Sequence, residues 1–242
     1  MEIAEYKKMD SIEARHFWFK AKRDFLKIVI DRFLSQKKAK ILDVGCGTGA
    51  VLQDLKKNGY DVFGIDSSDQ AIFYCIQKGL NVKKGDATNL GYEKDTFDAV
   101  MLLDVIEHLE DDKSAVAEAY KVLKPGGIAI ITVPAHKFLW SYHDVSLHHK
   151  RRYNKKQLMS LFGTEWKIEV FSWLHALTFL PAFIIRSAKS FFGFEAKESD
   201  VKMPNSVINM LMNWFYVIEL FIFRIFLRLP FGVSLMIVAR KK

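Results

Sequence analysis

Short apolar runs alternate with amphipathic patterns along the first 134 residues. Runs rich in β-branched residues predict strands at 38–45, 61–66, 81–86, 97–105 and 128–134. Apolar positions with helical spacing predict helices between them, at 49–59, 67–79 and 113–123. Strands that alternate strictly with helices indicate an α/β protein with a doubly wound, mostly parallel sheet that helices cover on both faces.

The second half of the chain is more apolar and carries few acidic residues. Strands are predicted at 166–173 and 233–241, and Phe, Leu, Ile and Trp dominate the stretch between them. Its first apolar run, 174–185, is too short to span a bilayer of about 30 Å and contains Pro181. We expect three parts: an N-terminal helical cap at 1–36, a core at 37–172 and 232–242, and an apolar helical insertion at 173–231.

A second apolar run, 207–229, is long enough to cross a membrane but is interrupted by polar residues. On a helical projection most of these fall within about a third of the circumference: Asn209, Asn213, Arg224 and Arg228. The opposite face is apolar, with Glu219 as an exception at its edge. The basic and aromatic residues favour a helix lying in a membrane surface. The alternatives are packing on the core, a homodimer interface, or a true membrane span.

The net charge and the cysteine content indicate which partners and which cellular compartment to expect. The formal charge of +8 suits an anionic partner surface. Cys46 and Cys75 do not form a C-x-x-C pair and are expected to be buried, reduced thiols. The first ten residues contain no apolar stretch, hence no secretory signal. We therefore expect a cytoplasmic protein, peripheral on the inner face of the membrane if the insertion binds lipid.

Candidate chemistry lies at the carboxyl ends of the predicted strands, where open α/β sheets bind their ligands. Asp43 precedes a loop in which Gly45, Gly47 and Gly49 stand at alternate positions. Glycines there allow a tight turn and let a ligand approach the backbone closely. A sharp strand–helix turn without any ligand would favour the same residues.

Two further acidic residues end neighbouring strands. Asp66, followed by Ser67, ends the second strand, where a carboxylate can accept hydrogen bonds from both hydroxyls of a ribose. Asp86, followed by Ala87, ends the third strand and could accept from an exocyclic amine. Each aspartate alone is more typical of a turn or a helix cap. Together with the glycine loop they indicate a nucleoside-binding site.

Five segments in order resemble the motifs of class I S-adenosylmethionine-dependent methyltransferases. They are ILDVGCGTG, the Asp66 position, GDATNL, FDAVMLLDVIEHLED and LKPGGIAIITVP, within residues 40–134. The resemblance implies a Rossmann-like sheet of seven strands in the order 3-2-1-4-5-7-6, with the last strand antiparallel. It also implies S-adenosyl-L-methionine as the cofactor.

The resemblance also implies roles for individual residues. The three loop glycines would follow the methionine part of the cofactor, Asp66 would bind the ribose, and Asp86 with Ala87 would lie at the adenine. Asp104, at the end of the fourth strand, would face the methionyl ammonium or the acceptor. Glu107 and His108, which follow it, would support the loop rather than take part in chemistry.

Titratable residues are dense in LWSYHDVSLHHKRRY, residues 139–153, on the acceptor side of the predicted site. His143, Asp144, His148 and His149 match no familiar zinc spacing, so no metal is expected. A solvated loop is one alternative. We favour a catalytic role in which His143 or His149 is the general base and Asp144 orients it, while Arg151 and Arg152 bind an anionic group of the acceptor.

Two segments resemble a subset of this family that is associated with saccharide or lipid-linked metabolism. HFWF begins at His16, and an HD-containing segment ends in RRY, with His149 as the second histidine of its pattern. We expect acceptor contacts from His16, Trp18, Tyr142, Arg151, Arg152 and Tyr153. The alternative for HFWF is core packing, because Phe17, Ala21, Phe25 and Val29 recur at four-residue steps.

These patterns predict a methyltransferase that acts on oxygen of a lipid-linked or saccharide-type acceptor. One alternative is a methyltransferase for a soluble small molecule, with the insertion as a lid or dimer arm. Another is a non-catalytic, membrane-associated binding module. No nucleic-acid substrate is expected, because the position after the fourth strand reads LLDVIEH instead of the N/D-P-P-Y/F segment of many base methyltransferases.

Overall fold

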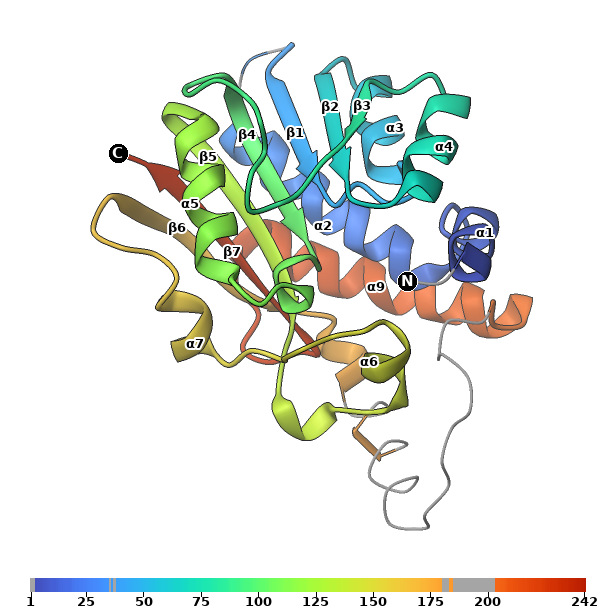
Figure 1. Cartoon of the computed structure of the whole chain (residues 1–242). Coiled ribbons are helices and arrows are strands. Elements are labelled where there is room, and N and C mark those ends of the chain that lie inside the picture. Colours follow the sequence, from blue (N-terminus) through green and yellow to red (C-terminus); the bar gives the residue numbers. More distant parts are fainter. Residues whose placement is uncertain (1–2, 35, 37, 180–182, 185–202) are drawn as a thin grey trace.

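A sheet of seven strands forms the centre of the protein (Figure 1). The computed structural model describes residues 3–34, 36, 38–179, 183–184 and 203–242. The strands are β1 (Lys40–Val44), β2 (Asp61–Asp66), β3 (Val82–Lys84), β4 (Phe97–Leu103), β5 (Leu123–Pro134), β6 (Trp166–Leu174) and β7 (Ser234–Lys241). Their order is β3-β2-β1-β4-β5-β7-β6, and β7 runs antiparallel to both of its neighbours. The predicted fold and strand order are confirmed.

Helices cover both faces of this sheet. The helical elements are α1 (Ile3–Ile12), α2 (Phe17–Phe33), α3 (Ala50–Lys57), α4 (Asp69–Gln77), η1 (Ile106–His108), α5 (Asp112–Val122), η2 (Lys137–Leu139), α6 (Tyr142–Ser146), α7 (Lys155–Met159) and α9 (Ser206–Phe226). Residues of α2, α3 and α9 share one hydrophobic cluster, and residues of α5 and α7 share the other. Successive β5 residues alternate between the clusters, so Ile130 enters one and Ile131 the other. A strand buried on both faces explains the continuous apolar run in the sequence.

The N-terminal helices lie against the glycine loop and the sheet. Phe25 and Val29 of α2 are fully buried, which confirms core packing for the helix that begins with HFWF. Directly after α1, the Glu13 carboxylate accepts a hydrogen bond of 2.6 Å from the Thr48 hydroxyl in the glycine loop. The Lys78 ammonium donates to the same carboxylate at 3.3 Å. The cap and the loop are therefore tied together.

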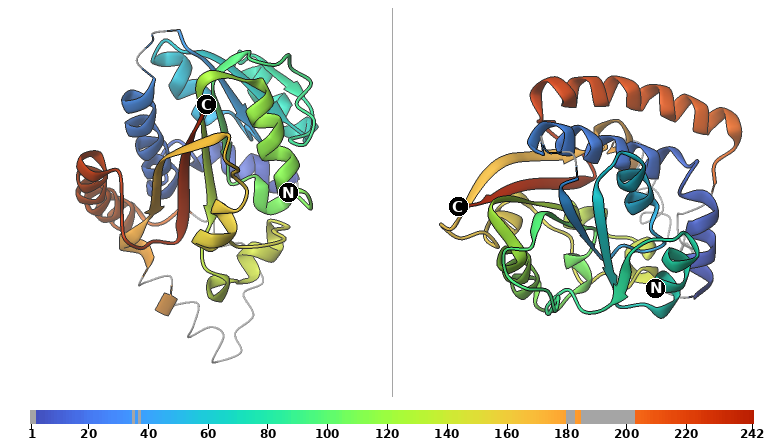
Figure 2. Two further views of the ribbon diagram at one scale, coloured as in Figure 1. Left: turned by 90° about the vertical axis from the view of Figure 1, so that its left-hand side faces the viewer. Right: turned by 90° about the horizontal axis from the view of Figure 1, so that it is seen from above.

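Helix α9 runs alongside α2 on the outside of the molecule (Figure 2). It contacts the domain through the face that carries Asn209, Tyr216, Glu219 and Phe223, and the last three of these are buried. Asn209 accepts from the Phe17 amide at 2.9 Å, and the Glu219 carboxylate accepts from two backbone amides that follow β6, at 2.9 and 3.1 Å. Asn209 and Glu219 therefore face the domain, whereas Arg224 and Arg228 are exposed.

The broad apolar face of α9 points to solvent. The helix residues assigned to this face from the sequence are all at least 40% exposed: Ile208, Leu211, Phe215, Ile218, Ile222 and Ile225. The alternative in which this face packs on the core is therefore wrong. The reason is that polar side chains on the other face cap amides of the domain, and those bonds fix the rotation of the helix.

Candidate functional site

A cavity of about 640 Å³ opens at the carboxyl ends of β1, β2 and β4. Its volume lies within the range of pockets that hold small organic ligands, about 300–1,000 Å³. One end is lined by predicted nucleoside-site residues from the sheet: Gly45, Gly47, Asp66, Ser67, Asp86, Ala87 and Asp104. The other end is lined by residues of the 139–153 loop and of η1: Glu107, His108, His143, His148, His149 and Arg152. Trp18, Phe19 and Lys22 of α2 also line it.

The glycine loop is held in a conformation that side chains would disturb. Gly45 and Gly47 have φ angles of +74° and +54°, and a Cβ on Gly45 would lie 2.5 Å from Val105 Cγ2. Gly49 is different, because it lies outside the cavity lining and begins α3 with φ of +87°. A Cβ there would meet Leu80 at 2.5 Å and Cys75 at 2.8 Å. Gly49 thus allows close packing of the loop against Cys75 of α4 and Leu80.

Asp66 and Asp86 organise the backbone around them. Asp66 accepts from the amides of Gly47 and Ser68, both at 2.9 Å, and so joins the β2 end to the glycine loop. Asp86 accepts from the Thr88 amide and hydroxyl, both at 2.7 Å. These bonds from Thr88 lower the pKa of Asp86, so its carboxylate is ionised and keeps acceptor capacity.

Asp43 and Asp104 occupy different environments. Asp43 is buried beneath the loop and is not among the residues that line the cavity; burial raises its pKa to about 7. Asp104 accepts from the Thr132 hydroxyl at 3.0 Å and forms an ion pair with Lys22. Burial raises the pKa of Asp104, but the Lys22 ammonium and the Thr132 hydroxyl outweigh it and hold the pKa below its usual value. Sequence reasoning missed Lys22, which sits on α2 among apolar positions.

Asp144 is the centre of the acceptor-side loop. Its fully buried carboxylate accepts from Arg152 Nε at 2.7 Å and Nη2 at 3.0 Å, from His149 Nδ1 at 2.9 Å, and from the Ser141 amide at 2.9 Å. Burial opposes ionisation, but the bonds from His149 and Arg152 hold the pKa of Asp144 well below its usual range. Asp144 therefore pairs with His149, whereas the His143 ring lies 6.4 Å from the His149 ring.

The basic pair and the tyrosine after the histidines have internal partners. The Arg152 guanidinium also donates to the Ala135 carbonyl at 3.0 Å. Arg151 donates to Asp112 and to the Leu109 carbonyl, both at 3.0 Å, and the Tyr153 hydroxyl donates to Asp112 at 2.7 Å. Their polar groups hold the loop against η1, α5 and the end of β5, and Arg152 also lines the cavity. Acceptor binding by Arg151, Arg152 and Tyr153 stays a prediction.

Of the remaining residues predicted to contact the acceptor, one lines the cavity and two lie outside its lining. His16 caps α2, because its Nδ1 accepts from the Trp18 amide at 3.2 Å, and it lies outside the cavity lining. Trp18 lines the cavity and stacks on His175 with ring centroids 3.8 Å apart. Tyr142 is 44% exposed and does not line the cavity.

Glu107 was missed as a site residue. Its side chain is fully buried, and neither carboxylate oxygen has a hydrogen-bond partner among the described residues. His149 Nε2 approaches one of these oxygens at 4.0 Å. One ring nitrogen of His108 lies within 4.8 Å of a Glu107 oxygen and of a His149 ring nitrogen. Burial raises the pKa of Glu107 well above its usual value. The sequence could not indicate this, because a glutamate after a strand is usually exposed.

Comparison with known proteins agrees with this architecture. Residues 42–131 match the family model described as a methyltransferase domain, and the match spans the glycine loop and the ends of β2 to β4. The chain also shares its fold with a SAM-dependent methyltransferase from Archaeoglobus fulgidus, at 23% identity and a TM-score of 0.53, over 90% of this chain and 94% of that one. Residues 42–131 thus match a methyltransferase domain, and the chain has the fold of S-adenosylmethionine-dependent methyltransferases. The match to a methyltransferase domain points to S-adenosyl-L-methionine as the cofactor.

Curated relatives match the core segment of this chain. A chloroplastic 2-methyl-6-phytyl-1,4-hydroquinone methyltransferase from rice is 36% identical over 107 residues, 42% of this chain and 32% of that protein. A ubiquinone biosynthesis O-methyltransferase from Rickettsia bellii is 37% identical over 97 residues, 38% of this chain and 40% of that protein. The match therefore covers well under half of each relative.

The shared fold does not by itself determine the reaction. The cyclase SpnF has the same fold, with a TM-score of 0.61 at 19% identity over 93% of this chain and 82% of that one. What this chain does depends on the residues that line its own cavity.

Proposed function

We propose that this methyltransferase methylates an oxygen atom of a lipid-linked or saccharide-type acceptor at a membrane surface. The observation that carries the proposal is the single cavity that joins the strand-end carboxylates to the Asp144–His149 pair. One end offers carboxylates that can accept hydrogen bonds from the hydroxyls and the amine of a nucleoside. The other end offers a histidine whose ring is oriented by a carboxylate. Methyl transfer to a hydroxyl needs both within one pocket.

The nucleoside end fits the cofactor. Asp66 would bind the ribose hydroxyls, Asp86 and Ala87 would contact the adenine, and the backbone of Gly45 and Gly47 would follow the methionine part. The cofactor supplies an electrophilic methyl group on a sulfonium. An ionised carboxylate at Asp86 and the paired carboxylate of Asp104 suit a positively charged ligand.

At the acceptor end, His149 would take the proton. Ionised Asp144 can only accept hydrogen bonds, so His149 Nδ1 must donate to it. In the neutral ring the lone pair then lies on Nε2, on the side of Glu107 and the cavity. A general base placed in this way typically contributes about 10²–10⁴ in rate. Arg152 keeps Asp144 ionised and in place, which makes it a positioning residue.

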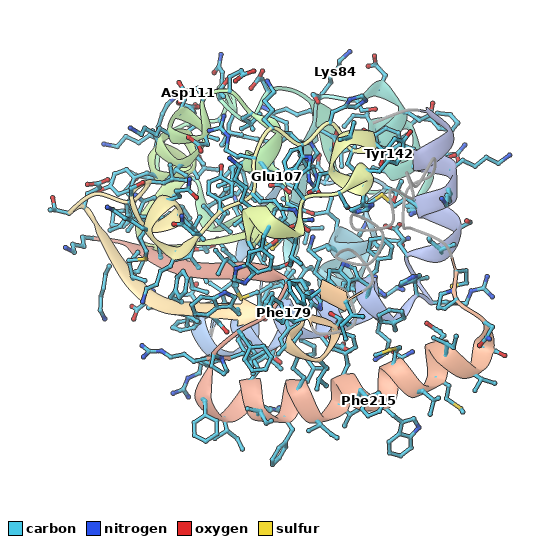
Figure 3. All side chains as sticks on the ribbon, turned by 90° about the horizontal axis from the view of Figure 1, so that it is seen from below. Lys84, Glu107, Asp111, Tyr142, Phe179 and Phe215 are labelled. Carbon is cyan, nitrogen blue, oxygen red and sulfur yellow. The ribbon has the colours of Figure 1, made fainter. Side chains whose placement is uncertain are left out.

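The membrane part of the proposal rests on α9. Besides the six residues named above, six further large apolar residues of α9 are exposed: Val207, Met210, Trp214, Val217, Phe221 and Phe226. Figure 3 shows side chains that point away from the domain along the helix. Trp214 is 70% exposed, Phe221 64% and Phe226 66%. Within the described part of the chain, α9 is long and apolar enough to cross a membrane by length and composition. Because its inner face packs along α2, we favour a position in the interface over a span.

An aromatic cluster connects this side of the molecule with the cavity. The Phe179 ring contacts those of Phe138, Phe183 and Phe231 at centroid distances of 6.0–6.4 Å, and the adjacent Thr178 lines the cavity. An acyl or prenyl tail could lie on this cluster while its polar end reaches His149. The name of the rice relative, a phytyl hydroquinone methyltransferase, supports an acceptor that combines a hydroxyl with an apolar tail.

Methyl-labelled S-adenosylmethionine, supplied with a cell extract split into lipid and aqueous fractions, tests the proposal. We expect label in the lipid fraction, loss of label with His149→Asn, and retention with His136→Asn, a matched substitution outside the cavity lining. Label only in water-soluble product would overturn the lipid acceptor and would assign the exposed face of α9 to a lid or dimer arm. A folded protein that binds cofactor but labels nothing would overturn methyl transfer.

A further inference from the structure

We propose that Glu107, His108 and His149 form a binding site for a divalent transition-metal ion, with Zn²⁺ as its best match. One ligand atom from each residue lies within 4.8 Å of the other two, and all three residues line the acceptor end of the cavity. Two imidazoles and one carboxylate are a donor set that zinc sites use. The inference goes beyond the proposed function, because metal binding needs neither cofactor nor acceptor.

The state of Glu107 is the first reason for a cation. Its two oxygens are buried without a hydrogen-bond partner in the described part of the chain. A buried polar group is ordinarily satisfied by protein, water or an ion, and buried charges are paired or bind metals. A cation bound to one of these oxygens would neutralise the carboxylate. The two histidines that stand next to it are neutral ligands and add no negative charge.

The orientation of His149 is the second, independent reason. Its Nδ1 donates to the buried Asp144 carboxylate at 2.9 Å, and Arg152 holds that carboxylate from the other side at 2.7 Å. This leaves Nε2 as the ligand atom toward Glu107, 4.0 Å away. Metal-binding histidines commonly donate their second ring nitrogen to a carboxylate, which fixes the tautomer and the ring. Asp144 would have that supporting role.

The third ligand comes from the same turn as the first. His108 follows Glu107 in η1, and its ring lies edge-on to the His149 ring at a centroid distance of 4.7 Å. Ligand atoms around a tetrahedral zinc ion lie about 3.4 Å apart, given Zn–N bonds of about 2.0–2.1 Å. The separations of up to 4.8 Å therefore need to shorten by as much as about 1.4 Å, which side-chain rotation can supply. Three ligands leave a fourth position open toward the cavity.

A metal at this site would change how the acceptor loses its proton. The ion would occupy the Nε2 lone pair, so His149 could not also be the general base. A hydroxyl oxygen of the acceptor at the open position would have a lowered pKa and would release its proton to water before the transfer. The sequence did not predict this site. The spacing of the titratable residues within 139–153 matches no familiar zinc motif, and two of the three ligands lie about 40 residues earlier in the chain.

Cobalt binding by metal-stripped protein tests the inference directly. We expect one equivalent of Co²⁺ to bind with a visible absorption band of a nitrogen-liganded ion, and Zn²⁺ to displace it. Glu107→Gln should weaken binding by more than about 100-fold, since even outer-shell partners of metal sites are worth about 10–100-fold. Glu110→Gln, an exposed glutamate three residues away, should leave binding unchanged.

Folding is checked by thermal unfolding in a chelator. Glu107→Gln replaces an unpaired buried carboxylate with a neutral amide, so this variant should be at least as stable as the wild type without metal and should lose the metal-induced rise in Tm. Absent cobalt binding in the wild type, or equal binding by folded Glu107→Gln, would overturn the site. Because metal binding is measured without cofactor or acceptor, failure of methyl transfer would leave this result standing.

Discussion

Replacing Asp144 with asparagine is expected to destabilise the whole protein although the two side chains have nearly the same shape. The Asp144 carboxylate is fully buried and receives both a bidentate bond from Arg152 and one bond from His149. The Arg152 side chain is itself only 4% exposed. The substitution therefore leaves a guanidinium buried without its counter-charge.

The magnitude follows from this arrangement. Removing one partner of a buried ion pair costs about 3–5 kcal/mol, and we expect the lower end because the asparagine oxygen and the Ala135 carbonyl still accept from Arg152. In a chain of this size each kcal/mol lowers Tm by about 2–4 °C, so Tm should fall by about 6–12 °C. The folded-state pKa of Asp144 is lowered, so its contribution is present above pH ~4 and is lost as pH falls through the folded value.

Urea unfolding at pH 7 and at successively lower pH measures both effects. The matched control is Asp24→Asn, which breaks an exposed pair with Lys20 and should cost no more than about 1 kcal/mol. The difference in the free energy of unfolding between Asp144→Asn and the wild type should become smaller as the pH drops below 4. A loss at pH 7 no larger than that of the control would refute the account of the loop.

Three further substitutions test separate parts of the structure. Gly49→Ala should cost about 1–3 kcal/mol more than Gly59→Ala in urea unfolding, because both have φ near +90° but only the first new Cβ meets Leu80; equal losses would contradict this packing. The pKa of Asp43 is raised to about 7, so its contribution to stability falls as pH rises from about 4 to 7. The free energy of unfolding of Asp43→Asn should therefore increase relative to that of the wild type over this range, and parallel pH profiles of the two proteins would refute this. Trp214→Asp should leave Tm nearly unchanged but reduce co-sedimentation with anionic lipid vesicles, whereas equal sedimentation would speak against the membrane face.

The sheet and the cofactor end could be predicted because they depend on local patterns. Strands buried on both faces leave continuous apolar runs, and strand-end positions of the glycine loop, Asp66 and Asp86 follow directly from those runs. The orientation of α9 could not be predicted, since an apolar helical face looks the same whether it meets a core or a membrane. Only the bonds of Asn209 and Glu219 decide it.

The acceptor end depends on contacts between distant or irregular segments. Lys22 pairs with Asp104 across 82 residues, and Arg152 turns back eight residues to reach Asp144. The sequence offered His143 and His149 equally as partners of Asp144, and the loop conformation brings only His149 within hydrogen-bond distance. The same loop buries most of Arg152 and Tyr153, and Arg152 still contributes to the cavity lining.

Calorimetric titration of the purified protein with S-adenosyl-L-methionine tests the central claim most directly. The account predicts saturable binding of one cofactor per chain, and Asp66→Asn should weaken it by about 10-fold or more, since hydrogen bonds to a charged group contribute about 1.5–3 kcal/mol. Thermal unfolding of the variant in parallel separates lost contacts from lost folding, because Asp66 also holds the Gly47 amide. A folded wild-type protein that shows no saturable binding, or a folded Asp66→Asn that binds equally well, would contradict the assignment of this cavity.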